Sequence, residues 1–306
     1  MKKILLATEK PFAKVAVEDI KKIAIEGGCE LVLLEKYTDK AQLLEAVKDA
    51  NAMIVRSDKV DAQVIEAAKN LEIVVRAGAG YDNIDLKAAT SSNIVVENTP
   101  GQNSNAVAEL AIGMMLMSAR EFYSGKSSYE LKGKKLGLLA YGNVSKCLAK
   151  IAKGLGMEIY AFDPYVAKAA IEADGIKVVD TKEQLFSTCQ YVSLHIPANE
   201  QTKKLINYEL LSKMPQNGVL VNTARKEVIN EEDLMKIMEE KSEFKYVSDI
   251  APDTADTFKQ KFEGRVFFTP KKMGAETSEA NINAGLAAIK QIVNYFKTGK
   301  PTFKVN

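Results

Sequence analysis

A glycine-containing turn between two mostly apolar runs is the segment of this chain best suited to chemistry. Residues 137–145 read Gly-Leu-Leu-Ala-Tyr-Gly-Asn-Val-Ser, and Asp163 follows the run 157–162. Where such a turn joins a strand to a helix, the N–H groups of the helix N-terminus can bind a pyrophosphate. A carboxylate ending the next strand can accept hydrogen bonds from ribose hydroxyls. The segment therefore predicts a dinucleotide site, with a crossover that binds no ligand as the alternative.

The glycine pattern of this turn is incomplete. In G-x-G-x-x-G, Ala140 and Ser145 stand at the first and third glycine positions, and Gly142 is kept. The order of strand, turn, helix over 144–155, strand and acid still favours the dinucleotide. Asp163 favours NAD, because a carboxylate repels the 2′-phosphate of NADP.

A second glycine turn follows the apolar run 73–75, and its successive N–H groups can form a nest for an anion. A neighbouring run, 52–55, is followed by two basic residues. Because parallel strands end at one edge of a sheet, we expect both segments to lie there as a substrate-binding site, with plain solvation of the basic side chains as the alternative. The candidates are Arg56, Ser57, Lys59, Gly78, Ala79 and Gly80.

Arg225 follows a third apolar run, 219–222. A guanidinium in this position can hold a substrate carboxylate through two parallel hydrogen bonds and polarise the neighbouring carbonyl. His195 is the only histidine of the chain, which makes it a candidate for proton transfer.

Composition narrows the class of protein. The chain has 306 residues, a formal charge of +2 and no basic run with interleaved aromatics, so nucleic acid is not an expected partner. No stretch reaches the length of apolar residues that a membrane span needs. The three cysteines stand apart from one another, without metal-ligand or disulfide spacing. We expect no metal, no membrane contact and a cytoplasmic location.

Short apolar runs alternate with helical periodicity along the whole chain. The pattern predicts an α/β fold of two Rossmann-like, doubly wound parallel-sheet domains with a cleft between them. Residues 1–99, completed by 280–306, are expected to form a substrate domain, and 100–279 an NAD-binding domain with six strands. Longer helices are expected over 105–120 and 279–296, and a helical segment over 40–50. Small residues and methionines in 105–120 indicate either core packing or a dimer contact.

From about residue 50 to 290 the chain resembles the NAD-dependent D-2-hydroxyacid dehydrogenases, and among them most closely the short D-3-phosphoglycerate dehydrogenases without a regulatory domain. The resemblance is carried by the Arg-Ala-Gly-x-Gly-x-Asp-Asn-Ile-Asp turn at 76–85, Asn-Thr-Pro-Gly at 98–101, Asp-Pro at 163, His-x-Pro at 195 and Asn-Thr-Ala-Arg at 222–225. It implies that Arg225 is the substrate arginine and that His195 lines the cofactor pocket. It further implies that Asp163 binds the adenosine ribose and Asp249 the carboxamide. Asn143 and Val144 would lie at the pyrophosphate and Thr223 beside the nicotinamide half. The remaining cofactor-binding residues would be Gly142, Pro197, Ala224, Gly274 and Ala275.

This chain departs from the family pattern at two positions that normally act as a pair. Members usually carry an acid–base histidine after Thr-Pro, oriented by a glutamate, but here the sequence is Thr-Pro-Lys-Lys-Met-Gly-Ala at 269–275, and Pro252 replaces the glutamate. A lysine beside Arg225 loses its proton more readily without a glutamate partner. Alignment from Thr-Pro selects Lys271 and alignment from Gly-Ala selects Lys272. We favour Lys272.

The resemblance implies reversible oxidation of 3-phospho-D-glycerate to 3-phosphohydroxypyruvate with NAD, the entry step of serine biosynthesis, in a homodimer formed through the NAD-binding domain. Arg225 and Lys272 would be catalytic, and Arg56 and Lys59 would bind the phosphate. Two alternatives stay open: a dehydrogenase of another D-2-hydroxy acid, and an NAD-binding protein that has lost catalysis.

Overall fold

The computed structural model describes all residues, 1–306. The chain forms two compact units, one of residues 1–103 and 276–306 and one of residues 104–275. The boundaries expected from the sequence, 99/100 and 279/280, each lie four residues from these. No helix of the chain combines the length and the apolar character that crossing a membrane requires.

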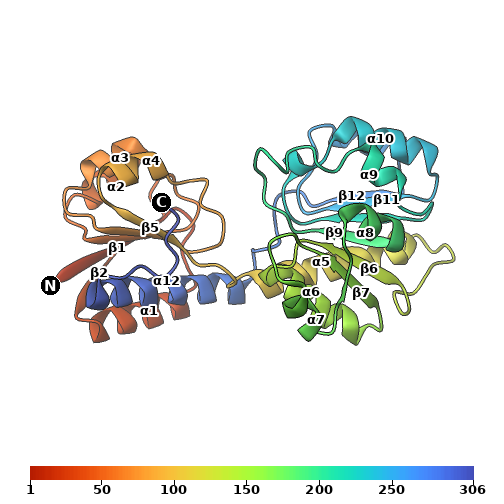
Figure 1. Cartoon of the computed structure of the whole chain (residues 1–306). Helices are drawn as coiled ribbons and strands as arrows, with labels where there is room; N and C mark the ends of the chain where they lie inside the picture. The colour runs from red at the N-terminus through yellow and green to blue at the C-terminus, as the bar shows by residue number, and fades with distance from the viewer. The chain divides into compact units, whose positions relative to one another are not determined.

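The first unit is a five-stranded parallel sheet with helices on both faces. Its strands are β1 (Lys2–Thr8), β2 (Cys29–Glu35), β3 (Ala52–Val55), β4 (Ile73–Arg76) and β5 (Val95–Asn98), and its helices are α1 (Lys14–Glu26), α2 (Lys40–Ala46), α3 (Ala62–Ala67), α4 (Leu86–Ser91) and α12 (Ser278–Thr298). The strand order is β2-β1-β3-β4-β5. Helices α1 and α12 pack together on one face, and α2, α3 and α4 cover the other (Figure 1).

The second unit is a seven-stranded parallel sheet of order β12-β11-β10-β9-β6-β7-β8. Its strands are β6 (Lys135–Leu139), β7 (Glu158–Phe162), β8 (Lys177–Val178), β9 (Tyr191–Leu194), β10 (Val219–Asn222), β11 (Lys245–Ser248) and β12 (Val266–Phe268). The helices are α5 (Ser104–Ala119), α6 (Asn143–Gly154), α7 (Lys168–Ala173), α8 (Lys182–Thr188), α9 (Tyr208–Ser212), α10 (Glu231–Glu240) and α11 (Ala255–Lys261), with short 3₁₀ turns η1 (Glu121–Tyr123) and η2 (Lys226–Val228). The expected α/β class with two parallel Rossmann-like sheets is confirmed.

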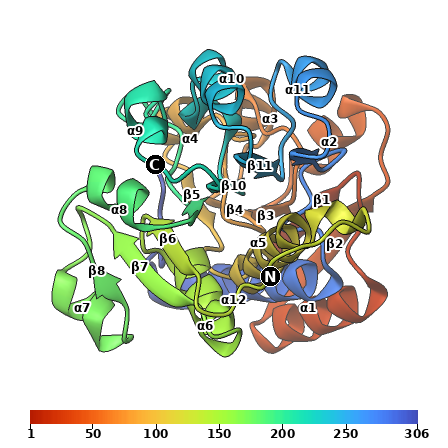
Figure 2. The same cartoon turned by 90° about the vertical axis from the view of Figure 1, so that its right-hand side faces the viewer.

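Two expectations about elements were wrong. The second sheet has a seventh strand, β8, a two-residue strand that pairs only with β7 at the edge (Figure 2). Its brevity left no periodicity to detect. Helix α2 ends at Ala46 instead of reaching residue 50, because the N–H groups after Val47 bond three residues back, Lys48 N to Glu45 O and Ala50 N to Val47 O, and form turns. Val47 and Ala50 are nevertheless buried, which is why the apolar periodicity runs past the end of the helix.

Apolar side chains fill the space on both faces of each sheet. In the second unit, one cluster lies under α5 and α6, and another lies between the opposite face and α8, α9 and α10. Strands such as β10, buried along their whole length, read as continuous apolar runs because both faces are covered. Each sheet thereby fixes the carboxyl ends of neighbouring strands along one edge, where the candidate residues follow.

Candidate cofactor and active site

The glycine turn joins β6 to α6 as expected. Ala140 adopts a left-handed backbone conformation with φ of +77°, and Gly142 is the residue preceding the first turn of α6. No side chain caps this helix, and a Cβ added at Gly142 would meet no atom within 4 Å. The N–H groups of Asn143 and Val144 therefore face an open approach, which suits an anion.

Asp163 lies where β7 ends, beside this turn. Its Oδ2 accepts a hydrogen bond from Tyr141 N at 2.7 Å, and its Oδ1 accepts from Tyr165 N at 2.8 Å and from Val166 N at 3.2 Å. Three backbone N–H groups therefore hold this carboxylate in place. Asp163 is thus fixed as an acceptor at the carboxyl edge, next to the uncapped helix.

Arg225 and Lys272 come together at one backbone atom. Arg225 Nη1 donates to the Ala224 carbonyl oxygen at 2.9 Å, and Lys272 Nζ donates to the same oxygen at 3.3 Å. The loop after β10 is shaped by Asn222, which accepts from Ala224 N at 2.9 Å and donates to Arg225 O at 3.0 Å. Two cations from segments 47 residues apart are therefore neighbours at the carboxyl edge of β10.

The two adjacent lysines differ in their contacts. Both are exposed on the loop that follows β12, but the bond to Ala224 is made by Lys272. Met273 and Gly274, the next two residues, donate their backbone N–H groups to Asp249 after β11. Asp249 is fully buried, and Ala275 is half-buried at the end of this loop.

Two buried polar atoms lack partners at this edge. Thr223 Oγ1 and His195 Nε2 are shielded from solvent and make no hydrogen bond. Burial lowers the pKa of His195 to about 4, so its imidazole is neutral at pH 7. Pro197, two residues further on, is exposed and accepts from the Thr202 hydroxyl. Unpaired buried donors and acceptors are costly, and a bound amide or ribose can satisfy them.

The candidates of the first unit follow β3 and β4, which are adjacent and parallel. Arg56 is mostly buried and already bonded within this unit: Nη1 donates to Lys10 O at 2.9 Å and Nη2 to Asn281 Oδ1 at 2.6 Å, with Glu276 Oε2 3.8 Å away. Ser57 and Lys59, in contrast, are exposed. Lys59 is therefore the more accessible of the two basic candidates.

The glycine turn after β4 is organised by a residue to which the sequence analysis gave no role, Arg76. Its Nε donates to Arg56 O at 3.0 Å, and a Cβ at Gly78 would lie 1.3 Å from its Nη1. Gly78 has a φ of +149°, a conformation that residues with a Cβ rarely adopt, and the guanidinium lies over it. Gly78 N donates to Arg76 O at 2.8 Å, so an anion here would be met by the N–H groups of Ala79 and Gly80. The sequence did contain a signal for this role. Arg76 is the last residue of β4, Arg56 directly follows β3, and Arg225 comes three residues after the end of β10.

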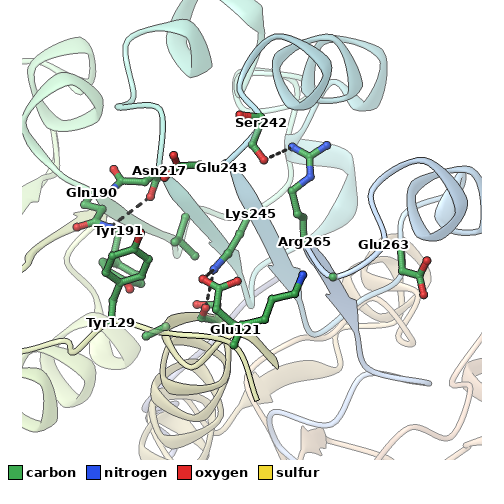
Figure 3. A pocket seen from close by; sticks show the side chains of 15 residues that line it. Glu121, Tyr129, Gln190, Tyr191, Asn217, Ser242, Glu243, Lys245, Glu263 and Arg265 are labelled. Carbon is green, nitrogen blue, oxygen red and sulfur yellow. Dashed lines mark hydrogen bonds and ion pairs between the residues drawn. The ribbon is translucent and has the colours of Figure 1, made fainter. Parts of the chain in front are cut away.

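A separate cavity of about 350 Å³ lies at the opposite, amino-terminal edge of the second sheet (Figure 3). Tyr191, Val219 and Lys245, the first residues of β9, β10 and β11, line it. Lys245 is buried, forms an ion pair with Glu121 and donates to Ser118 O at 2.9 Å. Ligands of open α/β sheets bind at the carboxyl ends of the strands, so this cavity is not the cofactor site.

Comparison with known proteins identifies the family of this chain. Residues 105–270 match the family described as "D-isomer specific 2-hydroxyacid dehydrogenase, NAD binding domain". The chain is 35% identical over 297 residues to a D-3-phosphoglycerate dehydrogenase of Methanocaldococcus jannaschii, covering 90% of this chain and 55% of that protein. It is 36% identical over 283 residues to a hydroxypyruvate reductase of Thermotoga maritima, covering 86% and 90%.

The chain belongs to the D-isomer specific 2-hydroxyacid dehydrogenase family. It is also similar, at 48% identity and a TM-score of 0.88, to the crystal structure of an NAD⁺-bound 3-phosphoglycerate dehydrogenase of Entamoeba histolytica, with 100% of this chain and 98% of that chain covered. Its residues 105–270 form the NAD-binding domain of the family, which confirms NAD as the cofactor. The chain spans about half the length of the archaeal phosphoglycerate dehydrogenase it matches.

Proposed function

We propose that this protein catalyses the reversible NAD-dependent oxidation of 3-phospho-D-glycerate to 3-phosphohydroxypyruvate, the entry step of serine biosynthesis. The observation that carries the proposal is the meeting of Arg225 and Lys272 at the Ala224 carbonyl, which offers a carboxylate binder and a proton carrier side by side. The similarity to the Entamoeba enzyme supports the choice of substrate.

The residues present fit NAD. The uncapped N-terminus of α6 suits the pyrophosphate, Asp163 suits the ribose, and the unpaired Thr223 Oγ1 and His195 Nε2 suit polar groups of the nicotinamide half. NAD⁺ held by these residues would supply the acceptor for the hydride that leaves C2 of the substrate.

The chain's own residues supply binding and proton transfer. Arg225 binds the substrate carboxylate in a bidentate pair and so holds C2 in one orientation. Neutral Lys272 accepts the proton of the C2 hydroxyl as the C–H bond breaks, and the ammonium returns it in the reverse direction. The ketone, NADH and one proton are the products, so charge and electrons balance without a metal ion.

We further propose that Lys59 is the main phosphate ligand and that Arg56 assists it. Lys59 is exposed at the carboxyl edge of β3. Arg56 must exchange part of its bonding to Asn281 and Glu276 to contact a phosphate. Ser57 and the N–H groups of Ala79 and Gly80 add uncharged donors at this edge.

A second candidate is a dehydrogenase of an unphosphorylated 2-hydroxy acid. The bonding of Arg56 within its own unit favours it, and so does the similarity to a hydroxypyruvate reductase. An NAD-binding protein without activity is a third candidate, because neither Pro252 nor the lysine loop keeps the family's acid–base pair.

A single assay distinguishes the three candidate functions. NADH absorbance is followed with 3-phosphoglycerate, glycerate and lactate in parallel, in the presence of NAD. We expect the highest kcat/KM with 3-phosphoglycerate. Preference for glycerate or lactate would select the second candidate, and the absence of turnover with all three despite NAD binding would select the third.

We also propose a homodimer formed through the NAD-binding domain. Gly113 and Leu116 are exposed on α5, and Tyr123 and Tyr129 are exposed on the segment that follows it. Exposed apolar groups gathered on one segment are typical of interaction surfaces. Light scattering after size-exclusion chromatography is expected to give twice the chain mass of 33.6 kDa, and Leu116→Lys is expected to shift it toward the monomer.

A further inference from the structure

The Asp249 carboxylate bonds to the loop that carries Lys272 from both ends. Oδ1 accepts from Met273 N at 2.7 Å and from the Thr269 hydroxyl at 3.2 Å, and Oδ2 accepts from Gly274 N at 2.8 Å. Two of these donors follow the lysine pair and one precedes it. The carboxylate thus links the two ends of the loop 269–274. We call these three hydrogen bonds to Asp249 the clasp.

Burial gives these bonds their strength. Asp249 and Thr269 are almost fully buried, and so is Gly274. Hydrogen bonds to an ionised acceptor are about twice as strong as neutral ones, and a buried carboxylate that loses its donors is strongly destabilised. The clasp therefore restricts the loop more than a solvent-exposed contact would.

Gly274 is part of the same arrangement. A Cβ at this position would lie 2.9 Å from Asp249 Oδ2 and 3.2 Å from a Val107 methyl carbon. The loop backbone approaches the carboxylate so closely that only glycine fits without displacement. The position of the loop is thus fixed by packing as well as by hydrogen bonds.

Pro252 stands at the position where the family resemblance places an orienting glutamate. Pro252 cannot pair with a lysine, and the residues after it are bonded to Glu231, which accepts from Asp253 N at 2.8 Å and from Thr254 N at 3.0 Å. The segment 252–254 is therefore bonded to the first residue of α10, Glu231.

We propose that Asp249 is the positioning residue for Lys272, acting through the backbone of the loop 269–274. This goes beyond contact with the carboxamide, for which one acceptor position of Oδ2 remains, and it rests on the proposed function because it takes Lys272 as the proton carrier. Holding the loop keeps Nζ beside Ala224 O and Arg225. A proton carrier displaced by about 1 Å can lose on the order of 10²-fold in rate.

The first measurement uses the protein without cofactor. In Asp249→Asn, the side-chain amide presents N–H donors where Gly274 N also donates, so the clasp opens. Hydrogen exchange read by mass spectrometry is expected to accelerate at Met273 and Gly274. Glu231→Gln, which loosens the neighbouring segment 253–254, serves as the matched control and is expected to leave these two amides protected. Unchanged exchange in Asp249→Asn would overturn the proposal.

The second measurement separates the loop from the carboxamide. The cofactor 3-acetylpyridine adenine dinucleotide carries a methyl group in place of the carboxamide nitrogen and cannot donate to Asp249. We expect Asp249→Asn to lower kcat by a similar factor, about 10–10²-fold, with NAD and with this analogue. Loss of the effect with the analogue would assign Asp249 to the carboxamide alone and overturn the proposal.

Two further variants keep the proposal testable if Asp249→Asn fails to fold. Gly274→Ala keeps the carboxylate intact but pushes the loop away from it, and it is expected to reproduce both the faster exchange and the lower kcat. In a Lys272→Met background, Asp249→Asn is expected to have little additional effect on kcat, because both act on one proton transfer. Full additivity would contradict positioning through Lys272. Wild-type turnover of Lys272→Met itself would contradict the proposed function, whatever the exchange rates.

Discussion

The hydroxyl of Ser145 donates a hydrogen bond to the carbonyl oxygen of Ala140 at 2.7 Å. These are the two positions at which the dinucleotide pattern normally has glycine, and the turn between them is the one proposed to face the cofactor. Ala140 keeps the left-handed conformation that a glycine would adopt, with φ of +77°, and Ser145 is fully buried. The chain thus replaces two glycines by a strained residue and a hydrogen bond that holds it.

Ala140→Gly is expected to stabilise the protein by about 1 kcal/mol, because the left-handed conformation costs an alanine about that much. Ser145→Ala is expected to destabilise it by about 1 kcal/mol, since the Ala140 carbonyl loses its partner. Urea unfolding followed by circular dichroism measures both. A destabilising Ala140→Gly would mean that the turn is not strained.

Cofactor preference is expected to depend on Asp163. Asp163→Ser removes the charge that repels a 2′-phosphate, so the ratio of kcat/KM for NAD to that for NADP is expected to fall at least about tenfold, consistent with the loss of one charged hydrogen bond. Asp163→Asn is the milder comparison, because it keeps one oxygen for the backbone donors that Asp163 bonds. An unchanged ratio in both variants would remove the role assigned to this carboxylate.

The sequence predicted those parts of the fold that depend on local pattern. Buried strands such as β9 and β10 read as apolar runs, and the turn before Asn143 was recognised from its strand, glycine and helix. It could not predict that Arg56 is bonded to Asn281, because the two residues are 225 positions apart and nothing local indicates their pairing. The sequence favoured Lys272 over Lys271, but a shift of one residue in the alignment exchanges them. The hydrogen bond from Lys272 Nζ to Ala224 O, which joins residues 48 positions apart, supports Lys272 and could not be read from local pattern.

Lys59→Ala is expected to raise the KM for 3-phosphoglycerate while leaving glycerate nearly unaffected, with a cost of roughly 1.5–3 kcal/mol for a charged hydrogen bond. Arg56→Ala is expected to affect both substrates and also to lower the unfolding midpoint, because its side chain is only 14% exposed and bonds three segments. Steady-state kinetics with both acids test this difference. Equal effects of Lys59→Ala on both acids would place the phosphate elsewhere.

His195 is expected to make the folded state sensitive to acid. Burial lowers its pKa from 6.5 to about 4, so below pH 6.5 the unfolded chain binds a proton that the folded chain does not. The fold loses at most about 3 kcal/mol from this group between pH 6.5 and pH 4 and nothing above that range. His195→Gln should flatten that part of the stability curve relative to wild type in the same buffers. A parallel curve in the variant would show that His195 is not the group responsible.

Lys272→Met is expected to reduce turnover by about 10²–10⁴-fold, the usual contribution of a positioned acid–base group. Methionine keeps the length and the apolar stem, so binding of NAD, followed by NADH fluorescence, should remain. Lys271→Met is the matched control, one residue away on the same exposed loop but without the bond to Ala224, and it should keep near wild-type turnover. In the wild type, oxidation needs the neutral lysine and reduction needs the ammonium, so the oxidation rate should rise with pH and the reduction rate should fall. Both dependences should disappear together in Lys272→Met. If they persist there and vanish in Lys271→Met, the proton passes through the other lysine.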